Sequence, residues 1–280
     1  MTPFSLNIRQ KLITYRRPLT MAIVNVTPDS FFAGSRIQTH DQLCRKTQQL
    51  IELNPDIIDI GAYSTRPGAG DIPPARESDN LCLAISTIRS LGCDIPISAD
   101  TFRASVASDA VSAGADIIND IAGGTLDSEM FETVARLQTP YILTHTRGTP
   151  RDMAGMTDYN DLLQDICADL AGKLARLNSL GVRDTIVDPG FGFAKTTAQN
   201  YILLRNLPQI KELLGRPILV GLSRKSMITK PLGISAEQAL CPTTALHAMA
   251  LDRGADILRV HDIEQAQQCI TLHSLLTTSQ

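Results

Sequence analysis

Eight short stretches rich in aliphatic and β-branched residues recur along the chain, and each is followed by a segment long enough for a helix. The stretches begin at Met21, Asp56, Ile95, Asp116, Tyr141, Thr185, Pro217 and Asp256. Their starts lie roughly 20 to 45 residues apart, which accommodates a strand, a helix and two loops. Helical periodicity is clearest between Leu162 and Leu180, behind Asp158 as a candidate N-cap. This alternation predicts a (β/α)8 barrel, with a doubly wound open sheet as the alternative.

No Pro/Ser-rich linker interrupts the alternation, so we expect residues 1–280 to form a single domain. Residues 5–17 precede the first stretch and predict a short β-hairpin that covers the floor of the barrel. A faint internal echo favours one repeated unit: PDII begins at Pro55, ADII at Ala115 and ADIL at Ala255.

Composition narrows the classes of function. Hydrophobic residues make up 43% of the 280 residues but aromatic residues only 4%, so the core must be aliphatic. The 26 basic and 29 acidic residues give a net charge of -3, which offers no basic field for nucleic acid or an anionic membrane and predicts small-molecule partners. The six cysteines form no Cys-x-x-Cys pair, which argues against zinc and disulfides and for a reducing compartment. Without an apolar signal or spanning segment, we expect a cytoplasmic protein.

Nearly every predicted strand ends in a polar or charged residue. These residues are Asn25, Ser64, Thr65, Arg66, Asp100, Asn119, His145, Asp188, Ser223, Lys225, Arg259 and His261. Taken singly, such a residue is more often a helix cap or turn former, and for Asp188 before Pro189 the turn is the obvious interpretation. In a (β/α)8 barrel, however, the loops after the strands build the active site, so these side chains are expected to meet at one rim.

The polar residues divide by chemistry into two sets. The first is cationic or carries polar oxygens, and comprises Asn25, Thr65, Arg66, Arg259 and His261. Guanidinium groups match phosphate oxygens two at a time, and an Asn amide oxygen suits a Mg²⁺ ion bridged to substrate phosphates. The second set comprises Asp100, Asn119, Asp188 and Lys225. It suits a flat heterocycle with several donors and a carbonyl, because a buried carboxylate needs donors to offset its desolvation.

Six blocks of this sequence together resemble dihydropteroate synthases, and they occur in that family's order. They are NVTPDSF from Asn25, STRPGA from Ser64, INDI from Ile118, DPGFGFAK from Asp188, SRKSMI from Ser223 and RVHD from Arg259. The resemblance implies a homodimeric, Mg²⁺-dependent transferase of folate biosynthesis. It would condense 6-hydroxymethyl-7,8-dihydropterin pyrophosphate with p-aminobenzoate to give 7,8-dihydropteroate and pyrophosphate, and sulfonamides would compete with the acid.

The resemblance also implies a role for individual residues. The pterin would be bound by Asp100, Asn119, Asp188 and Lys225, with the guanidinium of Arg259 stacked over it. The pyrophosphate would be bound by Asn25, Thr65, Arg66, Arg259 and His261, with Asn25 also the Mg²⁺ ligand. The p-aminobenzoate would contact Phe31, Thr65, Arg66, Pro67 and Ser226. Catalysis would rest on Asp100, Lys225 and Arg259. Pyrophosphate is expected to leave before the amine attacks.

Some positions depart from the family pattern. Ala33 and Tyr63 stand where the family usually has Asp and Glu, and Thr144 and Thr146 flank His145 where Met is usual. These changes put loop closure and affinity in question more than the reaction. His145 itself either lines the pterin pocket or is a satisfied core histidine.

Three other functions stay open on the sequence alone. A pterin-dependent methyltransferase barrel shares the ring-binding carboxylates but has no use for the phosphate set. An aldolase or isomerase would use Lys225 as a Schiff base. A non-catalytic paralogue would bind pterins without turning them over.

Overall fold

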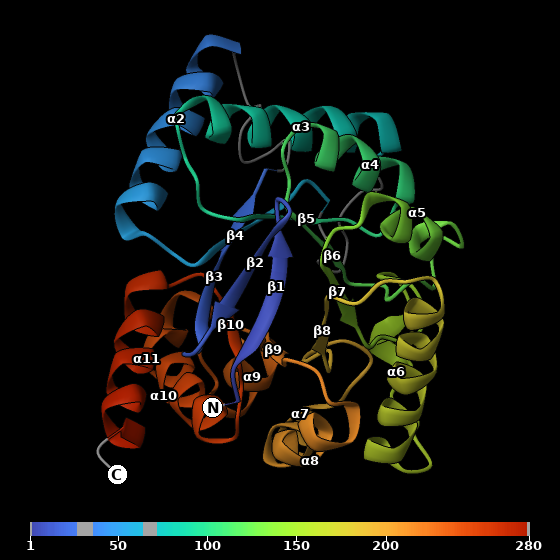
Figure 1. Cartoon of the computed structure of the whole chain (residues 1–280). Coiled ribbons are helices and arrows are strands. Elements are labelled where there is room, and N and C mark those ends of the chain that lie inside the picture. The colour runs from blue at the N-terminus through green and yellow to red at the C-terminus, as the bar shows by residue number, and fades with distance from the viewer. Residues whose placement is uncertain (1, 27–35, 64–71, 279–280) are drawn as a thin grey trace.

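The computed structural model describes residues 2–26, 36–63 and 72–278, and these contain an eight-stranded parallel sheet ringed by helices (Figure 1). The strand order is β8-β7-β6-β5-β4-β3-β10-β9. A parallel bridge between Val187 of β8 and Ile218, just before β9, joins the two ends of the sheet. The sheet is therefore a closed barrel, which confirms the (β/α)8 prediction and excludes the open sheet.

The strands of the barrel are short, and they start within about two residues of the predicted positions. They are β3 (Leu19–Asn25), β4 (Ile57–Gly61), β5 (Ile97–Asp100), β6 (Ile117–Asp120), β7 (Tyr141–Thr144), β8 (Thr185–Asp188), β9 (Leu219–Val220) and β10 (Ile257–Val260). The helices between and after them are α2 (Arg36–Leu53), α3 (Pro74–Ser90), α4 (Ala104–Ser112), α5 (Met130–Leu137), α6 (Leu162–Ser179), α7 (Thr197–Arg205), α8 (Leu207–Leu214), α9 (Ser226–Leu232), α10 (Leu240–Asp252) and α11 (Ile263–Thr278). Two 3-10 turns, η1 (Met153–Gly155) and η2 (Glu237–Ala239), lie between these helices and strands.

Helix α6 corrects one detail of the sequence interpretation. Its N-cap is Asp161, whose side chain accepts the backbone N–H of Gln164 at 2.9 Å. Asp158 lies three residues earlier and offers only its backbone carbonyl, to Arg147. The N-cap prediction at Asp158 was wrong because two acidic residues precede the apolar run and periodicity alone does not choose between them.

Strand periodicity divides the barrel interior into an apolar floor and a polar rim. The floor is a cluster of Leu6, Ile8, Leu19, Met21, Ile57, Ile117, Ile142, Ile186, Leu219 and Ile257. Two residues farther along a strand, the side chain returns to the same face, and there Ile57 is followed by Asp59, Ile117 by Asn119 and Ile257 by Arg259. The outward residues Leu258 and Val260 belong to the larger core under the helices. The inward-facing side chains therefore change from aliphatic to polar or ionisable within two residues along the strand.

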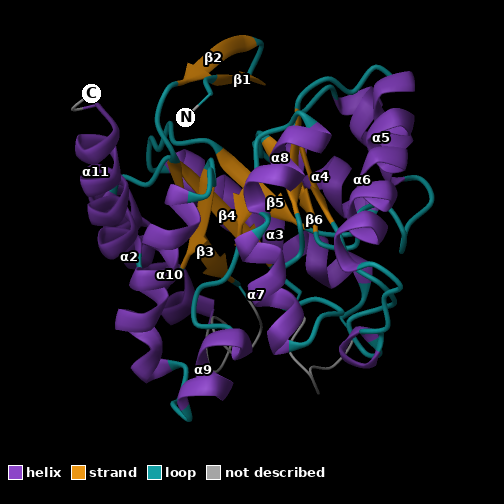
Figure 2. Ribbon diagram, turned by 90° about the horizontal axis from the view of Figure 1, so that it is seen from below, coloured by secondary structure: helices purple, strands orange, loops and turns teal. Residues whose placement is uncertain are grey.

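The hairpin covers the apolar end of the barrel, as expected. Strands β1 (Phe4–Ile8) and β2 (Lys11–Tyr15) pair in antiparallel register, and Phe4, Ile13 and Tyr15 pack against the floor cluster. Figure 2 shows the hairpin at one end of the barrel and α9 at the opposite end. The opening that remains for a ligand is therefore at the carboxyl ends of the strands.

The internal echo of the sequence has a structural cause at this floor. The Asp of each repeat precedes a strand and accepts a backbone N–H within one residue of the start of a neighbouring strand. Asp56 accepts from Thr20 at 2.9 Å, Asp116 from Ile97 at 2.8 Å and Asp256 from Ile218 at 2.8 Å. Each carboxylate thus replaces a hydrogen-bond partner that the last rung of the sheet lacks.

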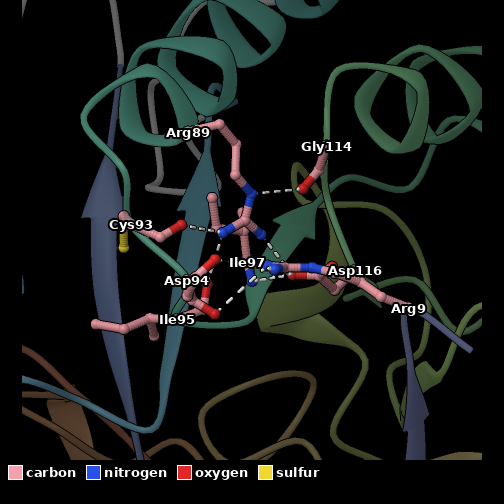
Figure 3. A network of polar contacts seen from close by, with 8 residues as sticks. All are labelled: Arg9, Arg89, Cys93, Asp94, Ile95, Ile97, Gly114 and Asp116. Carbon is pink, nitrogen blue, oxygen red and sulfur yellow. Dashed lines mark hydrogen bonds and ion pairs between the residues drawn. The ribbon is translucent and has the colours of Figure 1, made fainter. Parts of the chain in front are cut away.

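Asp116 also anchors the hairpin (Figure 3). Arg9, which follows β1, donates to both oxygens of Asp116 at 2.7 and 3.1 Å, and Arg89 at the end of α3 donates to the same carboxylate. The side chain of Asp116 is only 3% exposed. This ion pair fixes geometry because Asp116 without its cations would be a buried uncompensated charge.

Two further features concern the cysteines and the helices of the described residues. Within the part of the chain that the structure describes, none of the six cysteines forms a disulfide. A search of the described helices for one both long and apolar enough to cross a bilayer finds none.

Candidate active site

The carboxyl ends of four adjacent strands place polar side chains at one level of the rim. Asn25 of β3 is in register with Gly61 of β4, Gly61 with Asp100 of β5, and Asp100 with Asn119 of β6. Gly61 lies directly beside the Asp100 side chain, since an ideal Cβ on Gly61 would be 3.4 Å from the Asp100 Cβ. The predicted residues Asn25, Asp100 and Asn119 therefore share one row across the barrel mouth.

Arg259 of β10 bridges two carboxylates across the barrel. Its Nε donates to Asp59 Oδ2 at 2.6 Å and its Nη2 donates to Asp100 Oδ2 at 2.6 Å. Asn119 Nδ2 lies 3.3 and 3.2 Å from the two Asp59 oxygens. Because Asp59 is fully buried, each of its contacts comes from a donor that the pocket itself supplies. Asp59, Asp100, Asn119 and Arg259 thus form one connected network.

Asp188 and Lys225 lie on the other side of Arg259, around Gly221. An ideal Cβ on Gly221 would be 3.7 Å from Asp188 Oδ2, 3.8 Å from Lys225 Nζ and 3.9 Å from Arg259 Cβ. Asp188 Oδ1 accepts the backbone N–H of Gly190 at 2.8 Å. Asp188 is therefore the turn former that its position before Pro189 suggested, while its second oxygen faces the barrel mouth.

Burial sets the ionisation of these groups. It raises the pKa of Asp100 to about 7 against the opposing effect of Arg259, and it raises the pKa of Asp188 against the opposing effect of Lys225. Burial also lowers the pKa of Lys225 to about 8, while Asp188 acts to raise it. Arg259 differs, because its two carboxylates outweigh burial and raise its pKa above the ordinary value. Groups with pKa values moved toward neutrality are typical of functional sites.

Two contacts tie the end of β10 to the loop after β9. Ser223 Oγ lies 3.1 Å from His261 Nδ1, and it accepts the His261 backbone N–H at 3.3 Å. Arg224 forms a two-pronged ion pair with Asp262, with N···O distances of 2.8 and 2.7 Å. The loop between Ser223 and Ser226 carries Lys225, so these contacts fix the backbone position from which the Lys225 side chain extends. His261 itself is exposed at the rim.

His145 follows directly after β7 beneath this rim, where it is 1% exposed. Its Nδ1 lies 3.0 Å from Lys195 Nζ. Burial, together with the positive charge of Lys195, lowers the pKa of His145 to about 2. His145 is therefore buried, with Lys195 as the partner of one ring nitrogen.

Several predicted residues lie outside the described part of the chain. They are Phe31, Ser64, Thr65, Arg66 and Pro67, together with the substituted position Ala33. Of the described candidates, Ser226 is exposed as the first residue of α9, and Asn25 is exposed at the end of β3.

The sequence interpretation missed Asp59 and Lys195. Asp59 sits inside an apolar run, where it read as an ordinary strand residue. The signal was present, because Asp59 follows Ile57 at the spacing that returns a side chain to the barrel interior. Lys195 closes the DPGFGFAK block but stands seven residues after a strand end, beyond the positions that strand geometry addresses.

Comparisons with known proteins agree with this geometry. The family model described as pterin binding enzyme matches residues 21–261. A dihydropteroate synthase from Synechocystis sp. is 41% identical over 272 residues, which cover 95% of this chain and 93% of that protein.

Solved structures show the same likeness over the whole length. The Xanthomonas albilineans dihydropteroate synthase with 4-aminobenzoic acid is 35% identical, with a TM-score of 0.89 over 99% of each chain. The Yersinia pestis dihydropteroate synthase in complex with a sulfonamide drug is 32% identical, with a TM-score of 0.90 over 98% of this chain and 100% of that one. With the family model matching most of its length, the chain belongs to the dihydropteroate synthase family of pterin-binding enzymes.

Proposed function

We propose that this protein is the dihydropteroate synthase of a folate pathway. It would join 6-hydroxymethyl-7,8-dihydropterin pyrophosphate to p-aminobenzoate and release pyrophosphate, which makes it a transferase of the pterin methylene group. The observation that carries the proposal is the Arg259 guanidinium held between Asp59 and Asp100, with Asn119, Asp188 and Lys225 around the same opening. These residues offer a pterin both carboxylate acceptors and ammonium and amide donors at the bottom of one pocket.

The pterin is proposed to lie on this polar layer, just above the aliphatic floor. Its ring N–H and amino groups are donors that match Asp100 and Asp188, and its carbonyl oxygen is an acceptor that matches Lys225. Asn119 presents both an amide oxygen and an amide nitrogen, so it serves either kind of edge. Arg259 enters from β10 and would cover the ring with its planar guanidinium. A carboxylate buried at this depth without such partners would be costly.

The pyrophosphate is proposed to lie farther out, toward the exposed ends of β3 and β10. Asn25 and His261 are both exposed there, and Arg259 reaches the same region from below. Thr65 and Arg66 would complete this set. A single amide oxygen suits Mg²⁺, which keeps several waters and takes its other ligands from substrate phosphates. When bound, the ion would neutralise charge on the departing pyrophosphate.

The p-aminobenzoate is proposed to bind between the loops above the pterin. Ser226 is the described candidate for its carboxylate, and Phe31, Thr65, Arg66 and Pro67 are the candidates for the aromatic ring. Sulfonamides would compete at this position. Beside it, Tyr63 stands where the family usually has Glu, and its ring packs edge-on against Phe102 at 5.1 Å. That contact keeps the substituted side chain within an aromatic pair.

The order of bond changes follows from the charges of the pocket. The C–O bond to pyrophosphate would break first, leaving positive charge on the pterin methylene that anionic Asp100 stabilises. Arg259 and His261 would hold the departing diphosphate. The amine of p-aminobenzoate is neutral and nucleophilic at pH 7, so it attacks the methylene carbon without a strong base, and the cationic nitrogen that results then releases one proton to water. Lys225 would act throughout as a hydrogen-bond donor to the pterin.

One experiment separates this proposal from the alternatives. The protein is mixed with the pterin pyrophosphate, p-aminobenzoate and Mg²⁺, and pyrophosphate and dihydropteroate are both measured. The proposal requires equal amounts of the two products. Tight pterin binding without product would favour the non-catalytic paralogue, and methyl transfer to a corrinoid would favour the methyltransferase barrel. Borohydride trapping of Lys225 with a carbonyl substrate would favour the aldolase.

We further propose that the protein acts in the cytoplasm as a homodimer joined through α10 and α11. These helices pack on each other and expose Met249, Leu272, Leu275 and Leu276. Met249 is 54% exposed and Leu276 is 78% exposed. Cys241 and Ala245 lie on the same side of α10 as Met249, at helical spacing, and both are exposed. Several exposed apolar side chains on two packed helices are typical of a surface that binds a partner.

A further inference from the structure

Lys195 is a buried cation that the proposed reaction does not use. It is 7% exposed. Its Nζ lies 3.0 Å from His145 Nδ1, 3.0 Å from the Gly190 carbonyl oxygen and 3.1 Å from the Phe193 carbonyl oxygen. An ammonium group has three N–H donors, so these three acceptors satisfy it fully. Within the described residues Lys195 forms no ion pair. The buried Asp116 of the floor, in contrast, is paired with two arginines.

The two carbonyls that Lys195 holds belong to the loop after β8. This loop is pressed against the end of β7, since an ideal Cβ on Gly190 would lie 1.9 Å from the His145 carbonyl oxygen. Gly190 has a φ of 78°, which a residue with a side chain rarely adopts. Asn200 supports the far side of the loop, because its Oδ1 accepts the Gly192 N–H at 2.7 Å. The loop is therefore fixed by side chains rather than by a strand partner.

The same loop holds Lys225 in place. The Phe191 carbonyl oxygen accepts a hydrogen bond from Lys225 Nζ at 2.6 Å, and the Phe193 ring centroid lies 4.5 Å from that nitrogen. Gly192 lets the stem of Lys225 pass, because an ideal Cβ there would lie 3.1 Å from Lys225 Cδ. Lys195 thus fixes the residues on either side of the carbonyl that receives Lys225.

Electrostatics connects Lys195 to the other side of the pterin pocket as well. Lys195 and Lys225 both act to lower the pKa of Asp188, so this carboxylate lies in the field of two ammonium groups. Burial lowers the pKa of Lys195 itself to about 7, with Asp188 opposing. A cation kept in a buried position without a carboxylate partner is costly to stability, and such groups concentrate at functional sites.

We propose that Lys195 is a positioning residue for pterin binding: by holding the Gly190 and Phe193 carbonyls against His145, it sets the place of Lys225 and the charge around Asp188. The inference rests on the proposed function, because it requires Asp188 and Lys225 to contact the pterin. It assigns Lys195 no contact with substrate. Its effect is expected on pterin affinity rather than on p-aminobenzoate.

The test compares two lysine variants that both release backbone carbonyls. Lys195→Met removes the ammonium at the site, and Lys211→Met removes one at the barrel floor. Lys211 donates to the Gly254 carbonyl oxygen at 3.0 Å and to Asp256 at 2.7 Å, and so matches Lys195 as a brace far from the pocket. The dissociation constant of 6-hydroxymethyl-7,8-dihydropterin pyrophosphate with Mg²⁺ is measured calorimetrically for both variants and the parent.

Both variants are expected to unfold at lower temperature than the parent. Only Lys195→Met is expected to bind the pterin pyrophosphate at least about tenfold more weakly, with a smaller change in the KM of p-aminobenzoate. Equal pterin affinity in parent and Lys195→Met would overturn the inference, as would an equal loss in Lys211→Met. A parent protein that fails to bind the pterin at all would instead overturn the proposed function.

A measurement on the unaltered protein covers the case in which Lys195→Met does not fold. Because an ammonium group has only donors, His145 Nδ1 must accept and its proton must lie on Nε2. Below the pKa of about 7 that burial gives Lys195, nitrogen-15 NMR of labelled histidine is expected to show His145 as this neutral tautomer between about pH 5 and 6. Addition of the pterin is expected to shift the nitrogen resonances of His145. A proton on Nδ1, or a ring that titrates in that range, would contradict the proposed hydrogen bond.

Discussion

Nε of Arg259 donates to Oδ2 of Asp59 over 2.6 Å, and Asp59 has no exposed surface. The guanidinium is therefore neutralised from below before any substrate arrives. Its second contact, with Asp100, lies at the level of the predicted pterin ligands. Arg259 consequently joins the stable interior of the barrel to the part of the pocket that must exchange partners when a pterin binds.

Replacement of Arg259 by Ala is expected to damage both stability and turnover. Asp59 would be left as a buried charge without its cation, which costs about 3–5 kcal/mol of unfolding free energy. Binding of the pterin pyrophosphate would weaken and turnover would be largely lost. Arg259→Lys is the informative partner, since one ammonium cannot reach both carboxylates as the planar fork does. Denaturant unfolding and steady-state kinetics measure the two effects, and an Arg259→Ala enzyme with normal saturation would contradict the assignment.

The pH dependence of kcat/KM for the pterin substrate should be bell-shaped. This quantity reports on the free enzyme, in which the pKa of Asp100 is raised to about 7 and that of Lys225 is lowered to about 8. Activity would rise with pH as Asp100 becomes anionic and fall as Lys225 loses its proton. The two limbs belong to the coupled site, so Asp100→Asn should remove the acid limb from whatever activity remains. A flat profile between about pH 6 and 9 would contradict this account.

The contribution of Asp100 to stability should fall over the pH range in which activity rises. Its folded pKa lies above the unfolded value near 3.9, so the unfolded chain releases this proton first. The contribution of Asp100 to the unfolding free energy therefore falls as pH rises between about 4 and 7. Asp100→Asn is expected to remove that loss, and to unfold at higher temperature than the parent at pH 8. Thermal unfolding of both proteins at pH 5 and pH 8 measures the difference.

The barrel and the rim could be predicted because both follow from the strand period. Once eight strands were placed, the residue at each strand end had to face the same opening, and this brought Asn25, Asp100 and Asn119 into one row. Asp59 was missed because it lies two residues before the end of its strand, where an inward-facing side chain is expected to be apolar. No periodicity addresses Lys195, since its contacts depend on how a glycine-rich loop folds back. The repeated PDII, ADII and ADIL sequences indicated that Asp116 has a structural role. They could not identify Arg9 and Arg89 as its partners, because these residues are distant in the sequence.

The ion pair between Arg224 and Asp262 is expected to control the position of Lys225. Arg224 has a φ of 56°, a left-handed conformation that costs a side-chain-bearing residue about 1 kcal/mol or more. Arg224→Ala loses the ion pair and keeps the strain, while Arg224→Gly loses the pair and relieves the strain. Both should raise the KM of the pterin substrate alike, but Arg224→Gly should be the more stable of the two. Unequal KM values would show that the backbone, not the guanidinium, sets the loop.

The floor network should matter for stability and not for catalysis. Asp116→Asn removes the charge that Arg9 and Arg89 share, and is expected to lower the unfolding free energy by about 3–5 kcal/mol while leaving KM unchanged. Asp94 is the matched control, because it is fully exposed and lies 3.6 Å from Arg9. Asp94→Asn should leave the free energy of unfolding nearly unchanged, because water screens a fully exposed charge. Equal effects of the two substitutions would mean that burial of Asp116 carries no weight.

The apolar face of α10 and α11 should bind a second copy of the chain. Met249→Asp places a charge in the middle of that face, where burial against a partner would be strongly unfavourable. Sedimentation velocity is expected to show a dimer for the parent and a monomer for the variant. Leu213→Asp is the control, since Leu213 is 64% exposed on α8 at a different part of the barrel, and it should leave the dimer intact. A parent that sediments as a monomer at micromolar concentration, or a Met249→Asp dimer, would show that this face serves another purpose.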